Sequence, residues 1–338
     1  MTPLLELRDV SKTFVKPVDL STRLANIAVL PFGAMPVREE VCRAVDNVGI
    51  RVMPGQVVGL VGESGCGKST VGRMAVGLHR PTSGERLWKG VNLSNVPSAQ
   101  RREAQLGMQM IFQDPYSSLN PRKRVMDIVG EAPVAHGLID AGQKADFVAG
   151  LLAKVGLSPS VLGRYPHQFS GGQRARVGIA RALAVDPELL VCDESVAALD
   201  VSIQAQVLNL FMRLRQELGL TYLFISHDLS VIRHISDEVV VMYLGRIVES
   251  GPASAFFDRQ YHPYSTALLR AAPSLESGKK QFKPISGEIP SSLSPPGGCH
   301  FHPRCPHAMP VCKVKAPELR IVTLGRLAAC HLNGEQNA

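Results

Sequence analysis

The feature that most constrains this chain is a glycine-rich run at residues 62–69, Gly-Glu-Ser-Gly-Cys-Gly-Lys-Ser, which fits the pattern G-x-x-x-x-G-K-[S/T]. A short apolar run, 57–61, precedes it and predicts a buried strand, and a helical pattern follows from Ser69 to Leu78. The glycines let the backbone wrap around a phosphate, and the helix N-terminus adds positive potential. We expect Lys68 to bridge the β and γ phosphates of a nucleotide and Ser69 to ligate Mg²⁺. The expected nucleotide contacts are Gly62, Glu63, Ser64, Gly65, Cys66, Gly67, Lys68, Ser69 and Thr70.

A pair of acidic residues follows a second buried strand. Leu189 to Cys192 is an uninterrupted apolar run, and Asp193 and Glu194 come directly after it. Parallel sheets gather their active sites at the carboxyl ends of the strands. One carboxylate can hold the magnesium ion while the other polarises an attacking water, which is the minimum equipment for hydrolysis. We therefore expect Asp193 as the metal ligand and Glu194 as the base, on a strand that neighbours the strand of the glycine loop.

A second helix start also carries a hydroxyl and two glycines, at Phe169 to Gln173. No lysine follows directly, so the pattern predicts an anion-binding helix terminus without a metal ligand of its own. Taken alone it is weak evidence, because Ser-Gly-Gly is common as a simple helix cap. The run that follows it, Arg174 to Leu183, makes the combination very specific.

Taken together and in this order, the motifs resemble those of the ABC ATPases, the nucleotide-binding subunits of ABC transporters, over about residues 4–270. The resemblance implies an α/β P-loop NTPase fold with a mostly parallel sheet core, an antiparallel β subdomain and a helical subdomain. It also implies that Phe14 stacks on adenine and that Gln113 contacts the magnesium ion and the water. His227 is expected to sense the γ-phosphate, and the loop that contains Asp200 is expected to cross a dimer interface.

The resemblance further implies that ATP is held between two subunits. The glycine loop and carboxylates of one subunit bind ATP, and the helix terminus of a second subunit closes over the γ-phosphate. Hydrolysis weakens this closed pair, and the motion passes through the region of Gln113 to a membrane partner. The residues expected to contribute from the helix terminus are Ser170, Gly171, Gly172 and Gln173.

Three further segments, 113–122, 262–269 and 298–306, resemble the ATPases of oligopeptide, dipeptide and nickel importers, and most of all the second ATPase of that system. This implies an ATPase that powers peptide import across the cytoplasmic membrane. The implied partners are a related ABC ATPase in a heterodimer, two membrane permease subunits and an extracytoplasmic solute-binding protein. The implied location is peripheral, on the cytoplasmic face of the inner or plasma membrane.

Composition and local residue patterns indicate how the chain is divided into domains. Its 338 residues suit about two domains, and we expect an ATPase domain at 1–272 and a linker with a cysteine-rich extension at 273–338. Within the first domain we expect an insertion at about 15–40 and the helical subdomain at about 114–178. The longest apolar runs are strand-sized, and the N-terminus lacks the basic segment of a secretory signal, so a cytosolic protein is expected.

Four cysteines, Cys299, Cys305, Cys312 and Cys330, crowd into the C-terminal extension among several histidines. A tail of about 40 residues with few large apolar side chains needs docking or a staple, because it cannot form its own core. Four thiolates can hold a [4Fe–4S] cluster or a zinc ion. The spacing is not that of ordinary zinc ribbons, which favours iron–sulfur, and the resemblance agrees. Plain reduced thiols remain the other alternative.

Two alternatives to peptide import remain open at this point. The same ATPase could power uptake of nickel or another small solute, because solute choice does not reside in these residues. A formal net charge of +8 keeps a non-transport ABC ATPase acting on nucleic acid open as well, although nucleic acid is disfavoured. The chain carries one glycine loop and one helix terminus of this kind, whereas translation-associated ABC proteins carry two of each.

Overall fold

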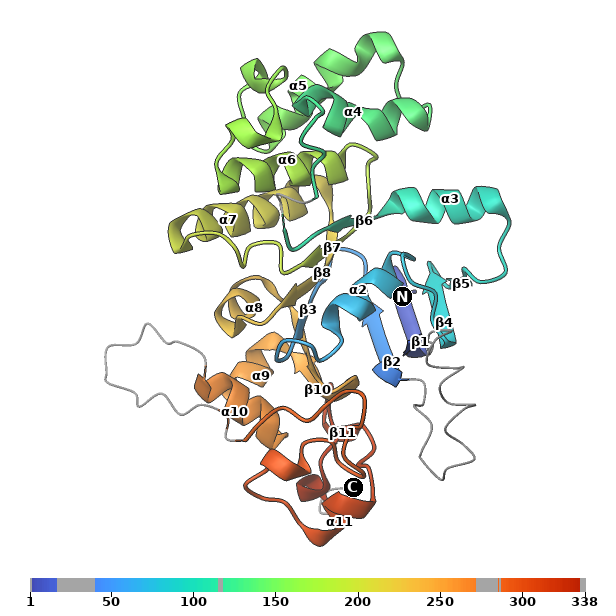
Figure 1. Cartoon of the computed structure of the whole chain (residues 1–338), viewed down its shortest axis with the longest axis vertical. Coiled ribbons are helices and arrows are strands. Elements are labelled where there is room, and N and C mark those ends of the chain that lie inside the picture. The colour runs from blue at the N-terminus through green and yellow to red at the C-terminus, as the bar shows by residue number, and fades with distance from the viewer. Residues whose placement is uncertain (1, 17–39, 115–117, 272–284, 286, 335–338) are drawn as a thin grey trace, which may run out of the picture.

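The computed structural model describes residues 2–16, 40–114, 118–271, 285 and 287–334. The expected insertion at about 15–40 and the start of the expected linker at 273 lie largely outside these residues. Figure 1 shows an eight-stranded sheet in the middle of the molecule, helices α4, α5 and α6 at one end, and the C-terminal segment at the other end.

The larger sheet has the order β11-β12-β10-β9-β3-β8-β7-β6. The five strands from β9 to β6 are parallel, whereas β10, β12 and β11 continue the sheet in antiparallel pairs. Parallel strands covered on both faces are expected to be apolar throughout, and β3, β7 and β8 are buried at every residue. The strands are β3 Val57–Val61, β6 Met108–Ile111, β7 Leu189–Asp193, β8 Thr221–Ser226, β9 Glu238–Tyr243, β10 Arg246–Pro252, β11 Arg320–Thr323 and β12 Arg326–Ala328.

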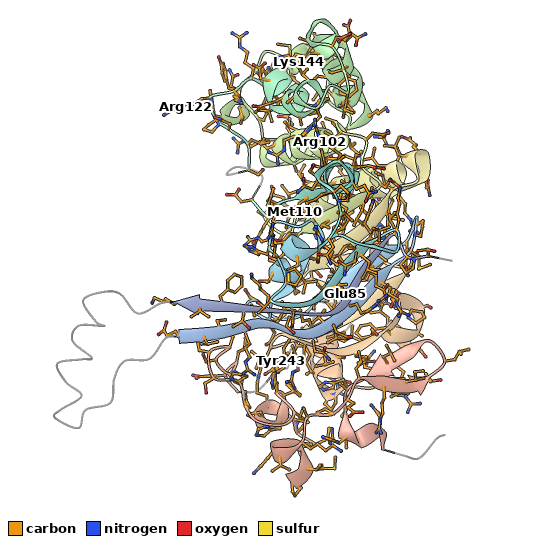
Figure 2. All side chains as sticks on the ribbon, turned by 90° about the vertical axis from the view of Figure 1, so that its right-hand side faces the viewer. Glu85, Arg102, Met110, Arg122, Lys144 and Tyr243 are labelled. Atoms are coloured by element: carbon orange, nitrogen blue, oxygen red, sulfur yellow. The ribbon has the colours of Figure 1, made fainter. Side chains whose placement is uncertain are left out.

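The smaller sheet is antiparallel with the order β2-β1-β4-β5, as the expected β subdomain requires. Figure 2 shows its two long strands, β1 and β2, projecting away from the rest of the molecule. A second apolar core lies between this sheet, helix α2 and the larger sheet, and its buried members include Val48, Met74 and Leu223. The strands are β1 Leu5–Lys16, β2 Glu40–Val52, β4 Ser83–Trp88 and β5 Val91–Asn92.

Helices cover the sheet and build the helical end of the molecule. Helix α6 continues to Leu183, which is five residues beyond the expected end of the helical subdomain at 178. In the part of the chain that the structure describes, none of the helices combines the length and apolar character that a membrane span needs. The helices are α2 Lys68–Ala75, α3 Ser98–Gly107, α4 Val125–Ala135, α5 Lys144–Lys154, α6 Gly171–Leu183, α7 Val201–Leu218, α8 Leu229–Ile235, α9 Ala253–Asp258, α10 Pro263–Ala271 and α11 Pro310–Val314.

The C-terminal extension packs directly on the ATPase body. Strand β12 pairs with β10, so that Glu249 lies opposite Ala328, and the two strands extend the larger sheet. Phe301 is fully buried and belongs to the main core cluster. The extension thus obtains its core by docking, as its shortage of large apolar residues requires.

Candidate active site

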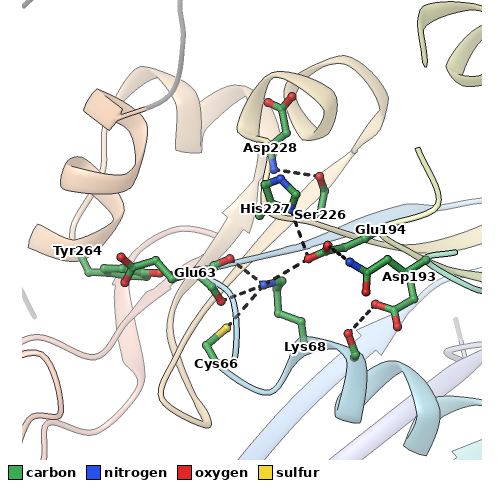
Figure 3. A network of polar contacts seen from close by, with 12 residues as sticks. Glu63, Cys66, Lys68, Asp193, Glu194, Ser226, His227, Asp228 and Tyr264 are labelled. Carbon is green, nitrogen blue, oxygen red and sulfur yellow. Dashed lines mark hydrogen bonds and ion pairs between the residues drawn. The ribbon is translucent and has the colours of Figure 1, made fainter. Parts of the chain in front are cut away.

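The glycine loop connects β3 to α2, as its sequence pattern predicts (Figure 3). Gly67 precedes the helix with φ of 105°, and a Cβ there would lie 2.1 Å from the Ala44 carbonyl oxygen. A Cβ on Gly62 would lie 2.2 Å from the Met242 carbonyl oxygen. Both positions therefore require glycine, because neighbouring backbone fills the space that a side chain would take.

Lys68 is buried beneath this loop. Its ammonium group donates hydrogen bonds to the carbonyl oxygens of Gly62 at 2.8 Å and Glu63 at 3.0 Å. It also lies 3.9 Å from the Glu194 Oε1 atom (Figure 3). The Cys66 sulfur lies 4.0 Å from the same ammonium group. A buried ammonium group beside the loop that follows β3 is suited to binding phosphate oxygens.

Ser69 and Asp193 meet although they are 124 positions apart in the sequence. The Ser69 hydroxyl donates to Asp193 Oδ1 at 2.8 Å. Asp193 is 2% exposed, and burial raises the pKa of its carboxyl group. A hydroxyl and a buried carboxylate form an oxygen donor pair of the kind that Mg²⁺ accepts when water and phosphate oxygens complete its shell.

Glu194 is the point at which three other site residues meet. Gln113 Nε2 donates to Glu194 Oε2 at 2.8 Å, and His227 Nδ1 lies 3.3 Å from Glu194 Oε1. Glu194 itself has φ of +46°, a left-handed conformation that is rare for a residue with a side chain, and its N–H donates to the Ile225 carbonyl oxygen. Such strain is typical of functional positions.

The strand order explains this convergence and corrects one expectation. Gln113 follows β6, Glu194 follows β7 and His227 follows β8, and these three strands are consecutive neighbours in the sheet. The expectation that Asp193 ends a strand adjacent to β3 is wrong, because β8 lies between β3 and β7. The intervening strand delivers His227, and helix α2 instead brings Ser69 to Asp193.

The second helix terminus is present and exposed. Ser170 caps α6, its hydroxyl accepts the Gln173 N–H at 3.4 Å, and the Gln173 side chain accepts the Ser170 N–H at 3.1 Å. Gly172 is buried, and a Cβ there would lie 2.4 Å from Ile203. Asp200, at the start of α7, is exposed. Ser170, Gln173 and Asp200 are exposed, so another subunit can reach them.

The remaining expected nucleotide contacts lie on the loop or at the start of α2, except for Phe14, which lies on β1. Ser64 and Gly65 are exposed and Thr70 is half-buried, whereas Cys66 is buried and burial raises the pKa of its thiol. Phe14 lies on the projecting part of β1 with 39% of its surface exposed. Its ring packs edge-on against His79, at 5.6 Å between centroids, and the Lys12 ammonium lies 5.2 Å from the ring centre.

Sequence reasoning missed two residues that contact the loop. The Glu63 N–H donates to the Tyr264 hydroxyl at 2.8 Å, and the Arg304 guanidinium donates two hydrogen bonds to the Glu63 carboxylate. Both residues stand in segments that mark the subfamily, His262 to Leu269 and Gly298 to Pro306. Those segments indicated the subfamily, but nothing in their residues predicted a contact with a loop 201 positions before Tyr264 and 241 positions before Arg304.

The four C-terminal cysteines are free thiols that line one small cavity together with His302, His307 and His331. Burial raises the pKa of Cys299 and Cys305, and that of Cys330 to about 11. Among the described residues, no group of three or more histidine, cysteine or acidic side chains is arranged to hold a metal ion. The expected metal or cluster therefore lacks support from a preformed ligand set, although the thiols converge.

Comparison with known proteins agrees with this site. Residues 45–197 match the ABC transporter family model, and residues 248–312 match the oligopeptide/dipeptide transporter C-terminal region. The chain is 47% identical over 97% of both chains to the oligopeptide transport ATP-binding protein AppF of Bacillus subtilis. It is 48% identical to OppF of Salmonella typhimurium, an oligopeptide transport ATP-binding protein, over 82% of this chain and 84% of the relative.

Solved structures share the fold. CbiO1 of Clostridium perfringens, part of an ABC transporter complex, aligns with a TM-score of 0.61 and 22% identity over 77% of this chain and 92% of its own. The dimeric ATP-binding cassette MJ0796, bound to ADP and Pi, aligns with the same TM-score and 24% identity over 76% of this chain and all of its own. The fold, the converging site and the relatives together show that the chain belongs to the ABC transporter ATP-binding proteins, in the branch that carries the oligopeptide/dipeptide transporter C-terminal region, and is an ATPase.

Proposed function

We propose that this chain hydrolyses ATP to power an importer of oligopeptides or dipeptides. The observation that carries the proposal is the convergence of Lys68, Gln113 and His227 on the Glu194 carboxylate, within 4 Å in each case. This arrangement places a general base beside a phosphate-binding lysine, which is what attack of water on a γ-phosphate requires. The peptide substrate is proposed from the names of the relatives and from the matching C-terminal region.

Within this proposal each site residue has a role. Ser69, Asp193 and Gln113 would hold Mg²⁺, which neutralises charge on the phosphates when bound. Glu194 accepts a proton from the attacking water, and His227 stabilises the charge that develops on the γ-phosphate. Phe14 stacks on adenine. The loop amides and side chains from Gly62 to Thr70 bind the phosphates.

The exposed helix terminus at Ser170 supports a proposal about assembly. We propose that Ser170, Gly171, Gly172 and Gln173 close over the ATP of a second, related ABC ATPase, and that the loop at Asp200 crosses this interface. The pair docks on two membrane permease subunits at the cytoplasmic face of the membrane, and an extracytoplasmic solute-binding protein supplies the peptide. We also propose the division into an ATPase domain at 1–272 and an extension at 273–338.

The cysteine cavity supports a further part of the proposal, a [4Fe–4S] cluster on Cys299, Cys305, Cys312 and Cys330, with zinc as the alternative. Four thiols around one cavity supply enough ligands for either group. Since burial favours the protonated thiols, binding must displace protons and should strengthen as pH rises. Anaerobically purified protein should contain iron and absorb near 400 nm, and the Cys330→Ser variant should contain less iron. Protein without iron or this absorbance would remove the cluster.

Reconstitution tests the proposed function. The chain should co-purify with hydrophobic permease subunits, and the assembly in proteoliposomes should hydrolyse ATP faster when the binding protein carries peptide. The Lys68→Ala assembly serves as the inactive control. If nickel and not peptide stimulated hydrolysis, the proposed substrate would be wrong and nickel would take its place. If the purified chain bound DNA in a salt-sensitive manner and no permease subunits co-purified, the proposed transport function would be wrong.

A further inference from the structure

The C-terminal extension reaches the glycine loop through a buried ion pair. Arg304, one residue before Cys305, donates from Nη1 to Glu63 Oε2 at 2.6 Å and from Nη2 to Glu63 Oε1 at 3.0 Å. Only 3% of the Arg304 side chain and 20% of the Glu63 side chain is exposed. A bidentate pair of this kind fixes both side chains in position as well as pairing their charges.

Glu63 transmits this contact to the phosphate-binding lysine. Its carboxylate is held by Arg304, its N–H donates to the Tyr264 hydroxyl at 2.8 Å, and its carbonyl oxygen accepts from Lys68 at 3.0 Å. Figure 3 shows Tyr264, Glu63 and Lys68 following one another in this network. The loop backbone is therefore fixed on one side by residues that lie outside the loop and its helix.

The charge of Glu63 makes the contact functionally relevant. A carboxylate in a loop that binds polyphosphate repels its ligand, and the repulsion is strong where water is excluded. The Arg304 guanidinium offsets that charge, and the hydrogen bonds to Glu63 raise the pKa of Arg304, so it stays protonated. Without Arg304, the negative charge of the Glu63 carboxylate would be left uncompensated next to the phosphate-binding loop.

The extension is docked firmly enough to hold Arg304 in place. The buried Phe301 ring packs against Tyr243, at 5.3 Å between centroids, and against Tyr264, at 5.4 Å. A second buried ion pair, Arg326 with Glu249 at 2.8 Å, anchors the extension to β10. Arg304 and Arg326 are thus both buried and both paired with a glutamate, but the glutamate that Arg304 pairs with belongs to the glycine loop and the one that Arg326 pairs with belongs to β10.

We propose that Arg304 is a positioning residue of the ATP site: it neutralises and fixes the Glu63 carboxylate, so that the C-terminal extension sets the affinity for ATP. This inference rests on one part of the proposed function, namely that the loop from Gly62 to Ser69 binds the phosphates of ATP. It assigns the extension a role that does not depend on whether its cysteines hold a metal.

Binding of a fluorescent ATP analogue, methylanthraniloyl-ATP with Mg²⁺, to the full-length chain tests the proposal. The variants are Arg304→Gln, Arg304→Lys, Glu63→Gln and the double variant Glu63→Gln/Arg304→Gln, with Arg326→Gln as the matched control for loosening of the extension. Melting curves identify variants that fail to fold. The two single glutamine variants and the double variant form a double-mutant cycle, which isolates the contribution of the pair.

We expect Arg304→Gln to weaken binding about tenfold or more, and Arg304→Lys, which keeps the charge but loses the bidentate geometry, to weaken it less than Arg304→Gln does. The double variant should bind within about threefold of the unmodified chain, because the repelling carboxylate is gone. Unlabelled ATP and ADP can each be used to displace the fluorescent analogue. Arg304→Gln should weaken the affinity for ATP more than the affinity for ADP, a difference that a purely structural role would not produce.

Three results would overturn the inference. Arg304→Gln could bind as well as the unmodified chain, the double variant could bind as weakly as Arg304→Gln, or Arg326→Gln could cause an equal loss. In each case the unmodified chain still binds ATP, so the proposed function stands. Failure of the unmodified chain to bind the analogue would instead overturn the proposed function, and this inference with it.

Discussion

Replacing Glu194 by glutamine should stop ATP hydrolysis and leave ATP bound. The substitution keeps the size of the side chain, and its amide oxygen can still accept the hydrogen bond from Gln113 that now measures 2.8 Å. It removes the negative charge and the ability to accept a proton from water. The chemical step should therefore suffer while the shape of the site is preserved.

The distances in the site give the size of both effects. A general base contributes about 10²- to 10⁴-fold to a rate, so ATP turnover should fall by that factor. The Glu194 carboxylate lies 3.9 Å from the Lys68 ammonium, and two unit charges at this distance attract each other by about 4 kcal/mol at an effective dielectric of about 20, before the cost of desolvation. The same carboxylate repels a γ-phosphate bound by Lys68, so its neutralisation should leave ATP affinity unchanged or higher.

Two assays on the reconstituted assembly separate these effects. Phosphate release in a single turnover measures hydrolysis, and retention of radiolabelled ATP after gel filtration measures trapping in the closed pair. The His227→Gln assembly provides a comparison at a residue that contacts the same carboxylate. Turnover of Glu194→Gln within threefold of the unmodified assembly would refute Glu194 as the base, and loss of ATP binding would refute the charge argument.

Three other changes test the surroundings of the site. Burial raises the pKa of Asp193, so its charged form destabilises the folded chain, and Asp193→Asn should raise the melting temperature of the nucleotide-free chain at pH 7 to 8. The difference in melting temperature between the two chains should narrow as the pH falls toward 3.8, where Asp193 becomes protonated. Equal melting temperatures at every pH would contradict this. His262 is buried and its pKa is lowered to about 3, so between pH 7.5 and pH 5 its imidazole gains a proton only in the unfolded state. The free energy of unfolding should therefore fall by about 2 kcal/mol over this range in the unmodified chain and not in His262→Gln. Urea unfolding at the two pH values measures this, with His234→Gln, a change at an exposed histidine, as the control. Gly67→Ala should abolish ATP binding, since its Cβ would lie 2.1 Å from a carbonyl oxygen, whereas Gly142→Ala, with open space around it, should bind normally in the same assay.

The sequence predicted those features that depend on neighbouring residues. The glycine loop, the cap at Ser170 and the apolar run before Asp193 each depend on a few consecutive residues, and each has the expected local structure. The α/β fold class is confirmed, with its parallel core and its antiparallel sheet. Local pattern was sufficient here because glycine conformation, capping and strand burial are local physical requirements.

Features that depend on strand order were not predictable in the same way. Both β8 and β7 are short apolar runs, and nothing in their residues indicates that β8 lies next to β3. The contact between Arg304 and Glu63 spans 241 positions and depends on how the extension docks. The convergence of the four cysteines on one cavity likewise results from docking, because their spacing alone fits several arrangements.

A structure of the Glu194→Gln assembly with Mg²⁺ and ATP bound tests the proposed ATP site most directly. Lys68 of this chain should contact the γ-phosphate of one ATP, which the helix terminus of the neighbouring ATPase covers, and Ser170 of this chain should cover the other ATP. An ATP bound away from Lys68, or a closed pair in which Ser170 contacts no nucleotide, would contradict the proposed ATP site.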